Sequence, residues 1–264
     1  MPEEYAKSRS ELEERILKGA PRLRLTDSFK FACHPKVSCF GDCCGDVNIL
    51  LTPRDVLRLK HRLGLSSGEF LALHTILPQG EAVKLPAPLL KMRENAKKSC
   101  CFLGENGCSV YPDRPWACRM YPLGFAAPAD PARSNEAFFF LLEEQGCAGF
   151  AEACTQTVAQ WLHDQGVDRP DELDAFMQEV AAGGHLQRWR NEEPRKLHMF
   201  FMATYDIDTF RRFIFDSSFL MRFELPEDEV ERLRDDDEEL LRFSVKWLEF
   251  SLLGRPALTM RAKP

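Results

Sequence analysis

The spacing of hydrophobic and polar residues predicts several helices and few strands near the start of the chain. Residues 1–20 carry apolar side chains at helical intervals, and Ser10 and Glu13 form a capping-box pair among them. Proline breaks up the later pattern and leaves room only for short strands, which we expect over residues 47–51 and 82–85.

Two further helices are predicted between these strands. Residues 53–63 open with a proline after the N-cap residue Thr52, continue with regularly spaced apolar residues, and end at Gly64. A shorter helix is predicted to start after Ser66.

Beyond Cys154 the hydrophobic pattern is almost purely helical. Helices are predicted over four stretches: residues 155–165, 170–182, 197–223 and 240–253. Their many aromatic residues recur at helical spacing, so we expect them to form a core rather than a stacking platform for a ligand. The acidic run DDDEE at residues 235–239 is predicted to be a solvated N-terminal turn of the last helix.

The composition is ordinary apart from its cysteines. Of 264 residues, 44% are hydrophobic and 29% are charged, as in globular proteins. The net charge of −6 argues against a general affinity for nucleic acid. Ten cysteines are many for a chain of this kind, and all of them fall between Cys33 and Cys154.

The charge changes where the cysteines end. Residues 1–154 carry 20 basic and 19 acidic groups, a net charge of +1, whereas residues 155–264 carry 15 and 22, a net charge of −7. We therefore predict three segments: an N-terminal helical arm at 1–28, a cysteine-cluster metal-binding module at 29–154, and a helical module at 155–264. We expect the helical module to fold without the metal.

The N-terminal residues carry charges every few positions and no apolar segment typical of a secretory signal. The longest apolar runs are far shorter than the roughly 20 residues of a membrane helix. We therefore expect a cytoplasmic protein that does not bind membranes. In a reducing cytosol, ten cysteines are better explained as metal ligands than as five disulfides.

The cysteines form two blocks. The first contains Cys33, Cys39, Cys43 and Cys44, and the second contains Cys100, Cys101, Cys108 and Cys118, followed by Cys147 and Cys154. Structural metal sites often join two such blocks, because the ion links loops that cannot bury a core by themselves. No CxxC turn of a zinc knuckle is present, and Asp46 stands where a radical-SAM loop would need its third cysteine.

The irregular spacing favours an iron–sulfur cluster, of the 4Fe–4S type, over zinc. Neighbouring side chains in an extended backbone point in opposite directions, so the adjacent pairs leave two alternatives open. Either one cysteine of each pair is a packing residue, or there are two metal sites. Cys100 and Cys154 are predicted to be small buried hydrophobic residues.

Four motifs carry a family resemblance. FACHPKVSCFGDCC, LTPRDVLRL, CCFLGENGCSVYPDRPWACRMYPLGF and GCAGF together resemble the YkgJ-type cysteine-cluster family, a zinc- or iron-chelating domain built around a CxxCxxCC motif. The resemblance covers roughly residues 29–150. It implies that the metal ligands are Cys33, Cys39, Cys43, Cys44, Cys101, Cys108, Cys118 and Cys147. The opening spacings here are five and three residues, where the family motif has two and two.

These observations predict a mainly α chain, in which an irregular, metal-organised cysteine module with short strands precedes a C-terminal helical bundle. The predicted function is metal binding, with a protein partner or protein substrate. Part of the family resembles flagellin lysine N-methylases, which implies an alternative: methyl transfer from S-adenosylmethionine to a protein lysine. No glycine-rich turn follows a strand, so this alternative ranks second.

No catalytic residue can be assigned. The six histidines are scattered, and His34 is expected to be a surface imidazole rather than a ligand. Arg114 and Arg119 flank Cys118 and can offset thiolate charge, although salt bridges to Asp113 or Asp55 explain them equally well.

Overall fold

The structure is a computed structural model that describes residues 19–78, 87–128, 136–167 and 170–261. Helices make up about 49% of these residues, and the strands form short antiparallel pairs. The predicted mainly α class is confirmed at this level. Within the described residues, no helix combines the length and apolar character needed to cross a bilayer. The helix predicted over residues 1–20 and the strand predicted over 82–85 lie outside the described residues, apart from the last two positions of that helix.

The chain divides into two compact units. The first comprises Met1–Leu51, Leu77–Val83 and Leu89–Arg169, and the second comprises Thr52–Ile76, Lys84–Pro88 and Pro170–Pro264. The boundaries of these units differ from those of the predicted segments, because the second unit includes residues from the middle of the cysteine region. Independent folding of residues 155–264 stays a prediction.

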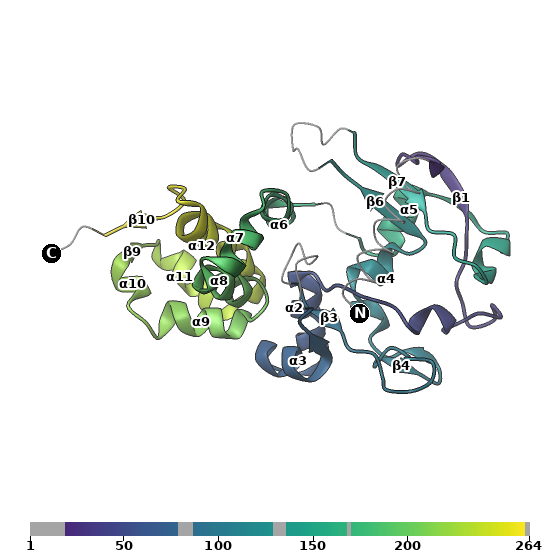
Figure 1. Cartoon of the computed structure of the whole chain (residues 1–264), viewed down its shortest axis with the longest axis horizontal. Coiled ribbons are helices and arrows are strands. Elements are labelled where there is room, and N and C mark those ends of the chain that lie inside the picture. The colour runs from purple at the N-terminus through teal and green to yellow at the C-terminus, as the bar shows by residue number, and fades with distance from the viewer. Residues whose placement is uncertain (1–18, 79–86, 129–135, 168–169, 262–264) are drawn as a thin grey trace. The chain divides into compact units, whose positions relative to one another are not determined.

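Two antiparallel strand pairs frame the first unit (Figure 1). β1 (Ser28–Lys30) pairs with β8 (Thr155–Thr157), and β6 (Leu123–Ala126) pairs with β7 (Phe138–Leu141). α5 (Val158–Asp164) follows β8 directly, with Thr157 as its N-cap. The helix predicted from residue 155 therefore starts three residues later, because the backbone of residues 155–157 is used for pairing with β1.

The core of the first unit is aromatic. Phe31 is 1% exposed, and its ring meets that of Trp161 edge-on with the centroids 5.5 Å apart. Phe29, Met120, Leu123 and Val158 complete the buried cluster around these rings. This core ties residues near the N-terminus to residues around position 160, and the cysteine-bearing loops run between them.

Short elements interrupt the loops that carry the cysteines. They are the 3-10 helices η1 (Asp42–Cys44), η2 (Tyr111–Asp113) and η4 (Ala148–Ala151), helix α4 (Trp116–Met120), and strands β3 (Leu89–Leu90), β4 (Leu103–Gly104) and β5 (Gly107–Cys108). Cys43 and Cys44 lie in η1, Cys108 lies in β5 and Cys118 lies in α4, and the other cysteines lie in loops. The strand predicted over residues 47–51 is wrong: Leu50 forms only an isolated bridge with Leu89.

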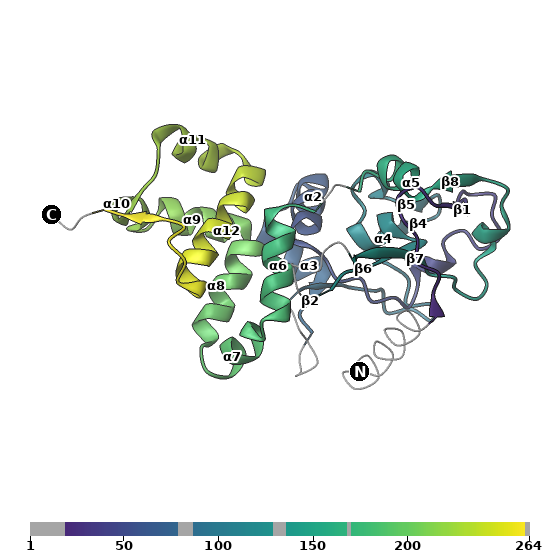
Figure 2. The same ribbon diagram turned by 90° about the horizontal axis from the view of Figure 1, so that it is seen from above.

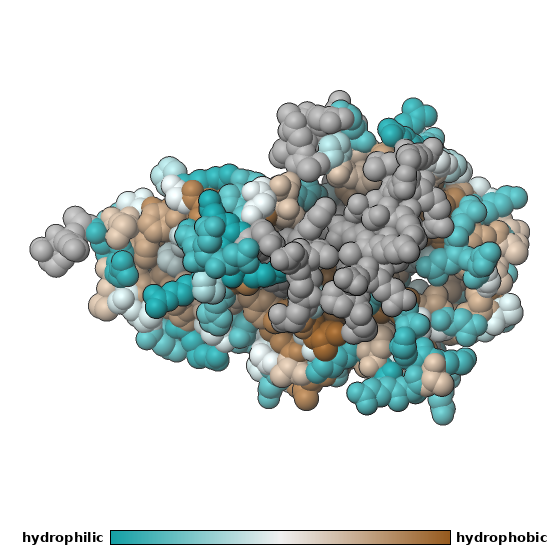
Figure 3. All heavy atoms as spheres, in the orientation of Figure 1, coloured by the Kyte–Doolittle hydropathy of each residue, from teal (hydrophilic) through white to brown (hydrophobic). Residues whose placement is uncertain are grey.

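The second unit is a helical bundle with one small strand pair (Figure 1, Figure 2). Its helices are α2 (Pro53–Leu63), α3 (Ser67–His74), α6 (Glu172–Ala182), α7 (His185–Asn191), α8 (Pro194–Thr204), α9 (Ile207–Phe215), α10 (Phe219–Arg222), α11 (Glu227–Asp235) and α12 (Asp237–Leu253). β9 (Phe223–Glu224) pairs with β10 (Thr259–Met260), and β2 (Thr75–Ile76) follows α3. Hydrophilic residues cover much of the face of this unit seen in Figure 3.

Local capping explains where α2 and α3 begin. Thr52 and Asp55 form a complete capping box at the start of α2, and Ser66 and Glu69 form one at the start of α3. Gly64 ends α2 in the left-handed conformation that glycine adopts readily. Both helices therefore match the prediction closely.

The aromatic residues of the second unit are core, as predicted. Phe200 and Phe210 are fully buried, and Phe219 meets Trp247 edge-on with the ring centroids 5.3 Å apart. The acidic run does form the first turn of α12, where Asp236 caps the helix. It is not wholly solvated, however, because the Asp237 side chain is only 14% exposed and is ion-paired with Lys60. Helices α7 and α11 were not predicted.

Candidate metal centre

All ten cysteines belong to the first unit, and each is a free thiol. Cys33, Cys43 and Cys154 are exposed, and the other seven are partly buried. The prediction that Cys154 is a buried hydrophobic residue is therefore wrong, and Cys100 is only partly buried. Within the described ranges, no three histidine, cysteine or acidic side chains stand together in a geometry ready to hold a metal ion.

The two cysteine blocks meet through their backbones. The amide of Cys100 donates a hydrogen bond to the carbonyl oxygen of Cys44 over 2.6 Å, and Gly45 forms a bridge with Ser99. A Cβ atom at Gly45 would lie 2.8 Å from the carbonyl oxygen of Lys97. Glycine at this position therefore allows residues 45 and 97, which are 52 positions apart in sequence, to approach closely.

The segment around Cys147 lies against the first block. The amide of Ala148 donates to Cys39 Sγ over 3.2 Å, and the amide of Ala32 donates to the carbonyl oxygen of Gly149 over 3.1 Å. Backbone N–H groups that point at cysteine sulfurs stabilise the thiolate form, which is the form that binds metals. Residues 32–39 and 147–149 thus form one thiol-bearing surface.

Thiols from distant positions influence one another electrostatically. Partial desolvation raises the pKa of Cys33, and repulsion between like charges raises it further. The thiols responsible for this repulsion are those of Cys43, Cys39 and Cys147. Burial also raises the pKa of Cys108, on which Cys100 acts in the same direction.

Within each adjacent pair of cysteines, one thiol has the lower pKa and therefore forms the thiolate more readily. A hydrogen bond from Cys44 lowers the pKa of Cys43 to about 7, whereas the same bond and burial raise the pKa of Cys44. A hydrogen bond from Cys101 likewise lowers the pKa of Cys100 to about 6. Cys101 is affected in the opposite direction, so its pKa is raised.

A tyrosine hydroxyl faces the first group of thiols. The Tyr121 ring meets Phe31 edge-on with the ring centroids 5.7 Å apart, and its hydroxyl oxygen is buried without a nitrogen or oxygen partner among the described residues. Burial raises the pKa of Tyr121, and a contact with Cys147 adds to the increase. A thiolate at Cys147 would give this hydroxyl an acceptor.

Arg114 supplies positive charge near both cysteine blocks. It lies 3.9 Å from the centre of the Tyr111 ring and donates hydrogen bonds to the Tyr111 carbonyl oxygen and the Gln165 side chain. Held in this way, it exerts a favourable charge effect on the thiolate forms of Cys33 and Cys108. Its predicted role near the thiols is therefore supported. Arg119 donates instead to the carbonyl oxygen of Gly166.

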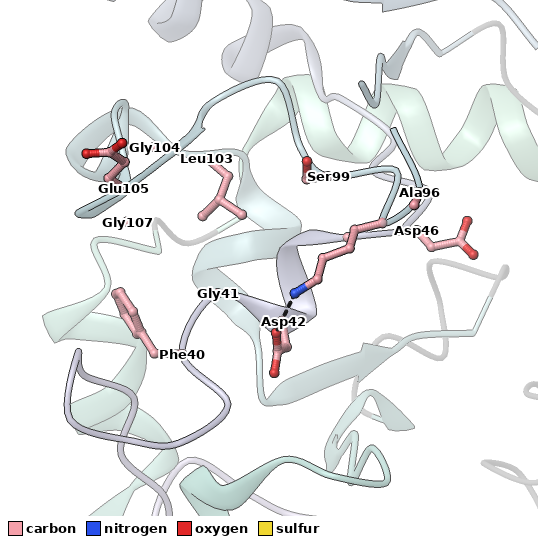
Figure 4. Close-up of a pocket in the computed structure, with 12 residues that line it drawn as sticks. Phe40, Gly41, Asp42, Asp46, Ala96, Ser99, Leu103, Gly104, Glu105 and Gly107 are labelled. Atoms are coloured by element: carbon pink, nitrogen blue, oxygen red, sulfur yellow. Dashed lines mark ion pairs between the residues drawn. The ribbon is translucent and has the colours of Figure 1, made fainter. Parts of the chain in front are cut away.

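A cleft of about 430 Å³ opens beside the junction of the two blocks (Figure 4). Asp42 and Gly45, which flank the Cys43–Cys44 pair, line one side, and Ser99 and Leu103, which flank the Cys100–Cys101 pair, also line it. Lys97 reaches across to Asp42, with its Nζ 3.8 Å from the carboxylate. The cleft gives solvent a route to the junction.

The donor set fits a metal centre. Thiolate sulfur is the ligand that Zn²⁺ and iron–sulfur clusters share, and the eight predicted ligands all lie in the first unit. The buried Tyr121 hydroxyl and the N–H group directed at Cys39 are the kind of outer partners that such ligands require. The ligand role of each cysteine stays a prediction.

Sequence reasoning overlooked one residue, Cys100. Alternation of side chains left open whether one cysteine of each adjacent pair is a packing residue or there are two metal sites, and Cys100 was predicted to be a packing residue. Only the backbone contact to Cys44 singles out Cys100. His34 pairs with Glu152 over 3.4 Å, as expected of a surface imidazole.

Comparison with known proteins agrees with this donor set. Residues 32–155 match the family CxxCxxCC, described as "Putative zinc- or iron-chelating domain". The chain therefore contains a domain of this zinc- or iron-chelating family, and the YkgJ-type resemblance is confirmed. Neither the curated proteins nor the solved structures include a match to the chain.

Proposed function

We propose that the chain is a metal-binding protein that holds an iron–sulfur cluster, of the 4Fe–4S type in preference to zinc. The proposed ligands are the eight positions implied by the family: Cys33, Cys39, Cys43, Cys44, Cys101, Cys108, Cys118 and Cys147. The observation that carries the proposal is the 2.6 Å hydrogen bond from the Cys100 amide to the Cys44 carbonyl oxygen, which brings the two cysteine blocks together.

Three further features support a cluster. The cysteine spacing is irregular and lacks CxxC turns, which sets it apart from zinc knuckles. The Ala148 amide donates to Cys39 Sγ, as backbone amides do around iron–sulfur clusters. The thiol of Cys43, one of the proposed ligands, has a pKa lowered to about 7, which favours the thiolate ligand form at physiological pH.

The proposal is a binding or assembly role in the cytoplasm, with a protein partner or protein substrate. A centre saturated by cysteines has no open position for a reacting group. The lysine-methyltransferase alternative stays a prediction, because no feature of the described residues favours it.

The test is elemental analysis of the full-length protein, purified without oxygen. We expect iron and acid-labile sulfide in equal amounts and broad visible absorption, both reduced in Cys43→Ser. Cys154→Ser is the matched control, because Cys154 is an exposed cysteine outside the predicted ligand set, and it should retain the metal. Stoichiometric zinc in a colourless protein would show that the site holds zinc rather than an iron–sulfur cluster. A protein without any metal would refute the proposal.

A further inference from the structure

We infer that a cleft in the second unit binds a peptide segment of a partner protein, in which a large apolar side chain stands next to a lysine or arginine. The cleft has a volume of about 310 Å³. It is lined by residues of α10, β9 and α11 and by Arg261, which directly follows β10 (Figure 1). The second unit contains no cysteine, so this inference goes beyond the proposed metal binding and does not depend on it.

The floor of the cleft is apolar. It combines the buried ring of Phe223 with the partly exposed side chains of Leu220, Leu225 and Val230. Met260 pairs with Phe223 across the β9–β10 ladder and is 51% exposed, so it adds a flexible thioether side chain next to the ring. The volume is at the lower end of the range of about 300–1,000 Å³ for ligand pockets, which suits an anchoring side chain better than a large cofactor.

One edge of the cleft is acidic. Glu227, Val230 and Glu231 occupy positions i, i+3 and i+4 of α11, so they lie on the same face of this helix. Two carboxylates four positions apart on a helix repel each other. Among the described residues, neither Glu227 nor Glu231 forms an ion pair. A cation brought by a partner would relieve this repulsion.

The other carboxylates at the start of α11 are already paired. Asp228 Oδ2 lies 2.7 Å from Arg232 Nη1, and Glu229 Oε1 lies 2.9 Å from Lys246 Nζ. Neither Asp228 nor Glu229 lines the cleft. The helix therefore pairs its carboxylates outside the cleft within the chain and leaves those at the cleft available to a partner.

The balance of charge indicates a basic partner. The lining holds two carboxylates and one guanidinium, that of Arg261, whose Nε donates a hydrogen bond to the Phe223 carbonyl oxygen over 3.1 Å. Residues 155–264 together carry a net charge of −7, from 15 basic and 22 acidic groups. Both the cleft and its surroundings attract a cationic segment, whereas a second copy of the chain would bring the same negative charge.

Selection from a phage-displayed library of random peptides on the immobilised full-length protein tests the inference. We expect the enriched peptides to carry a large apolar residue within a few positions of a lysine or arginine. A labelled peptide of this kind should bind in fluorescence anisotropy, and more weakly as the salt concentration rises. Enrichment of peptides without a basic residue, or no enrichment at all, would overturn the inference.

Variants assign the binding to this cleft. Glu227→Gln/Glu231→Gln should weaken peptide binding by about three- to tenfold, as expected for the loss of two exposed ion pairs. Glu172→Gln/Glu192→Gln is the matched control, because it removes the same charge from exposed positions of the second unit outside the cleft. Equal weakening in both double variants would trace the effect to overall charge and overturn the inference.

Leu225→Ser tests the apolar floor. It should weaken peptide binding while leaving the helical circular dichroism and the metal content of the protein unchanged, which keeps this result separate from that of the metal analysis. Size-exclusion chromatography with light scattering covers the remaining occupant. A dimer that dissociates in Leu225→Ser would assign the cleft to a second copy of the chain and overturn the inference.

Discussion

The Lys60 ammonium group lies 2.7 Å from Asp237 Oδ2, joining helix α2 to the first turn of α12 across 177 residues of sequence. The same nitrogen lies 2.8 Å from Asp208 Oδ1 in α9, and the Lys60 side chain is only 6% exposed. Arg211 also pairs with Asp237. The ion pairs of the buried Lys60 with these two carboxylates therefore attach α2 to the other helices of the second unit.

Replacing Lys60 by Met should destabilise this unit by about 2–3 kcal/mol, because it leaves the partly buried Asp208 carboxylate without its cation, although Asp237 keeps its ion pair with Arg211. This is below the range for fully buried pairs, since Asp208 retains some exposure. The measurement is urea denaturation of the full-length protein, followed by helical circular dichroism. Lys246→Met is the control: Lys246 pairs with Glu229 over 2.9 Å but is 53% exposed, so its loss should cost less than about 1 kcal/mol. Equal effects of the two variants would contradict the prediction.

Acid should weaken the same network. Burial raises the pKa of Asp208, but hydrogen bonds from Lys60 and the Ser67 amide outweigh burial and hold it below its usual range. A carboxylate with a lowered pKa contributes stability above its unfolded value of about 3.9, and this is lost as the pH falls through the folded value. The stability advantage of the wild type over Asp208→Asn should therefore be full at about pH 6 and decline toward pH 3. A constant difference across this range, or one that grows in acid, would contradict the argument; Lys60→Met should reduce the dependence on pH.

Gly45→Ala should lower metal loading although every cysteine is retained. The added Cβ would lie 2.8 Å from the Lys97 carbonyl oxygen and force the two cysteine blocks apart. Gly45 has φ −129°, a backbone conformation that alanine adopts, so the effect would come from the contact itself. Gly19→Ala is the matched control, since no atom of the described residues lies within 4 Å of a Cβ there. Metal content per chain is the readout, and unchanged loading in Gly45→Ala would show that the approach of the blocks is not required.

Tyr121→Phe should leave the cluster bound but make its reduction potential more negative. The buried hydroxyl faces Cys147, and a hydrogen bond donated to a ligand sulfur stabilises the reduced, more negative cluster. Redox titration of the iron-loaded protein measures the change. Tyr111→Phe is the control, because Tyr111 is 54% exposed. An unchanged potential in Tyr121→Phe would mean that the hydroxyl does not act on the cluster.

Short-range chemistry made parts of the structure predictable. The capping boxes at Thr52 and Ser66 act within four residues, so the helices they open could be placed from sequence. The pairing of β1 with β8 could not be predicted, because residues 28 and 157 pair through backbone groups that every residue has. That pairing converted the first three residues of a predicted helix into a strand.

The candidate metal centre likewise has features that the sequence predicts and features that only the tertiary structure shows. The sequence by itself determined that two cysteine blocks exist and that their residue types suit a thiolate metal centre, because ligand chemistry belongs to the side chain. Only the tertiary structure decided that the Cys100 amide meets the Cys44 carbonyl oxygen and that Lys60 is buried against Asp237. Both contacts join segments far apart in the chain. Such contacts depend on which surfaces the core brings together, and no local pattern around either residue contains that information.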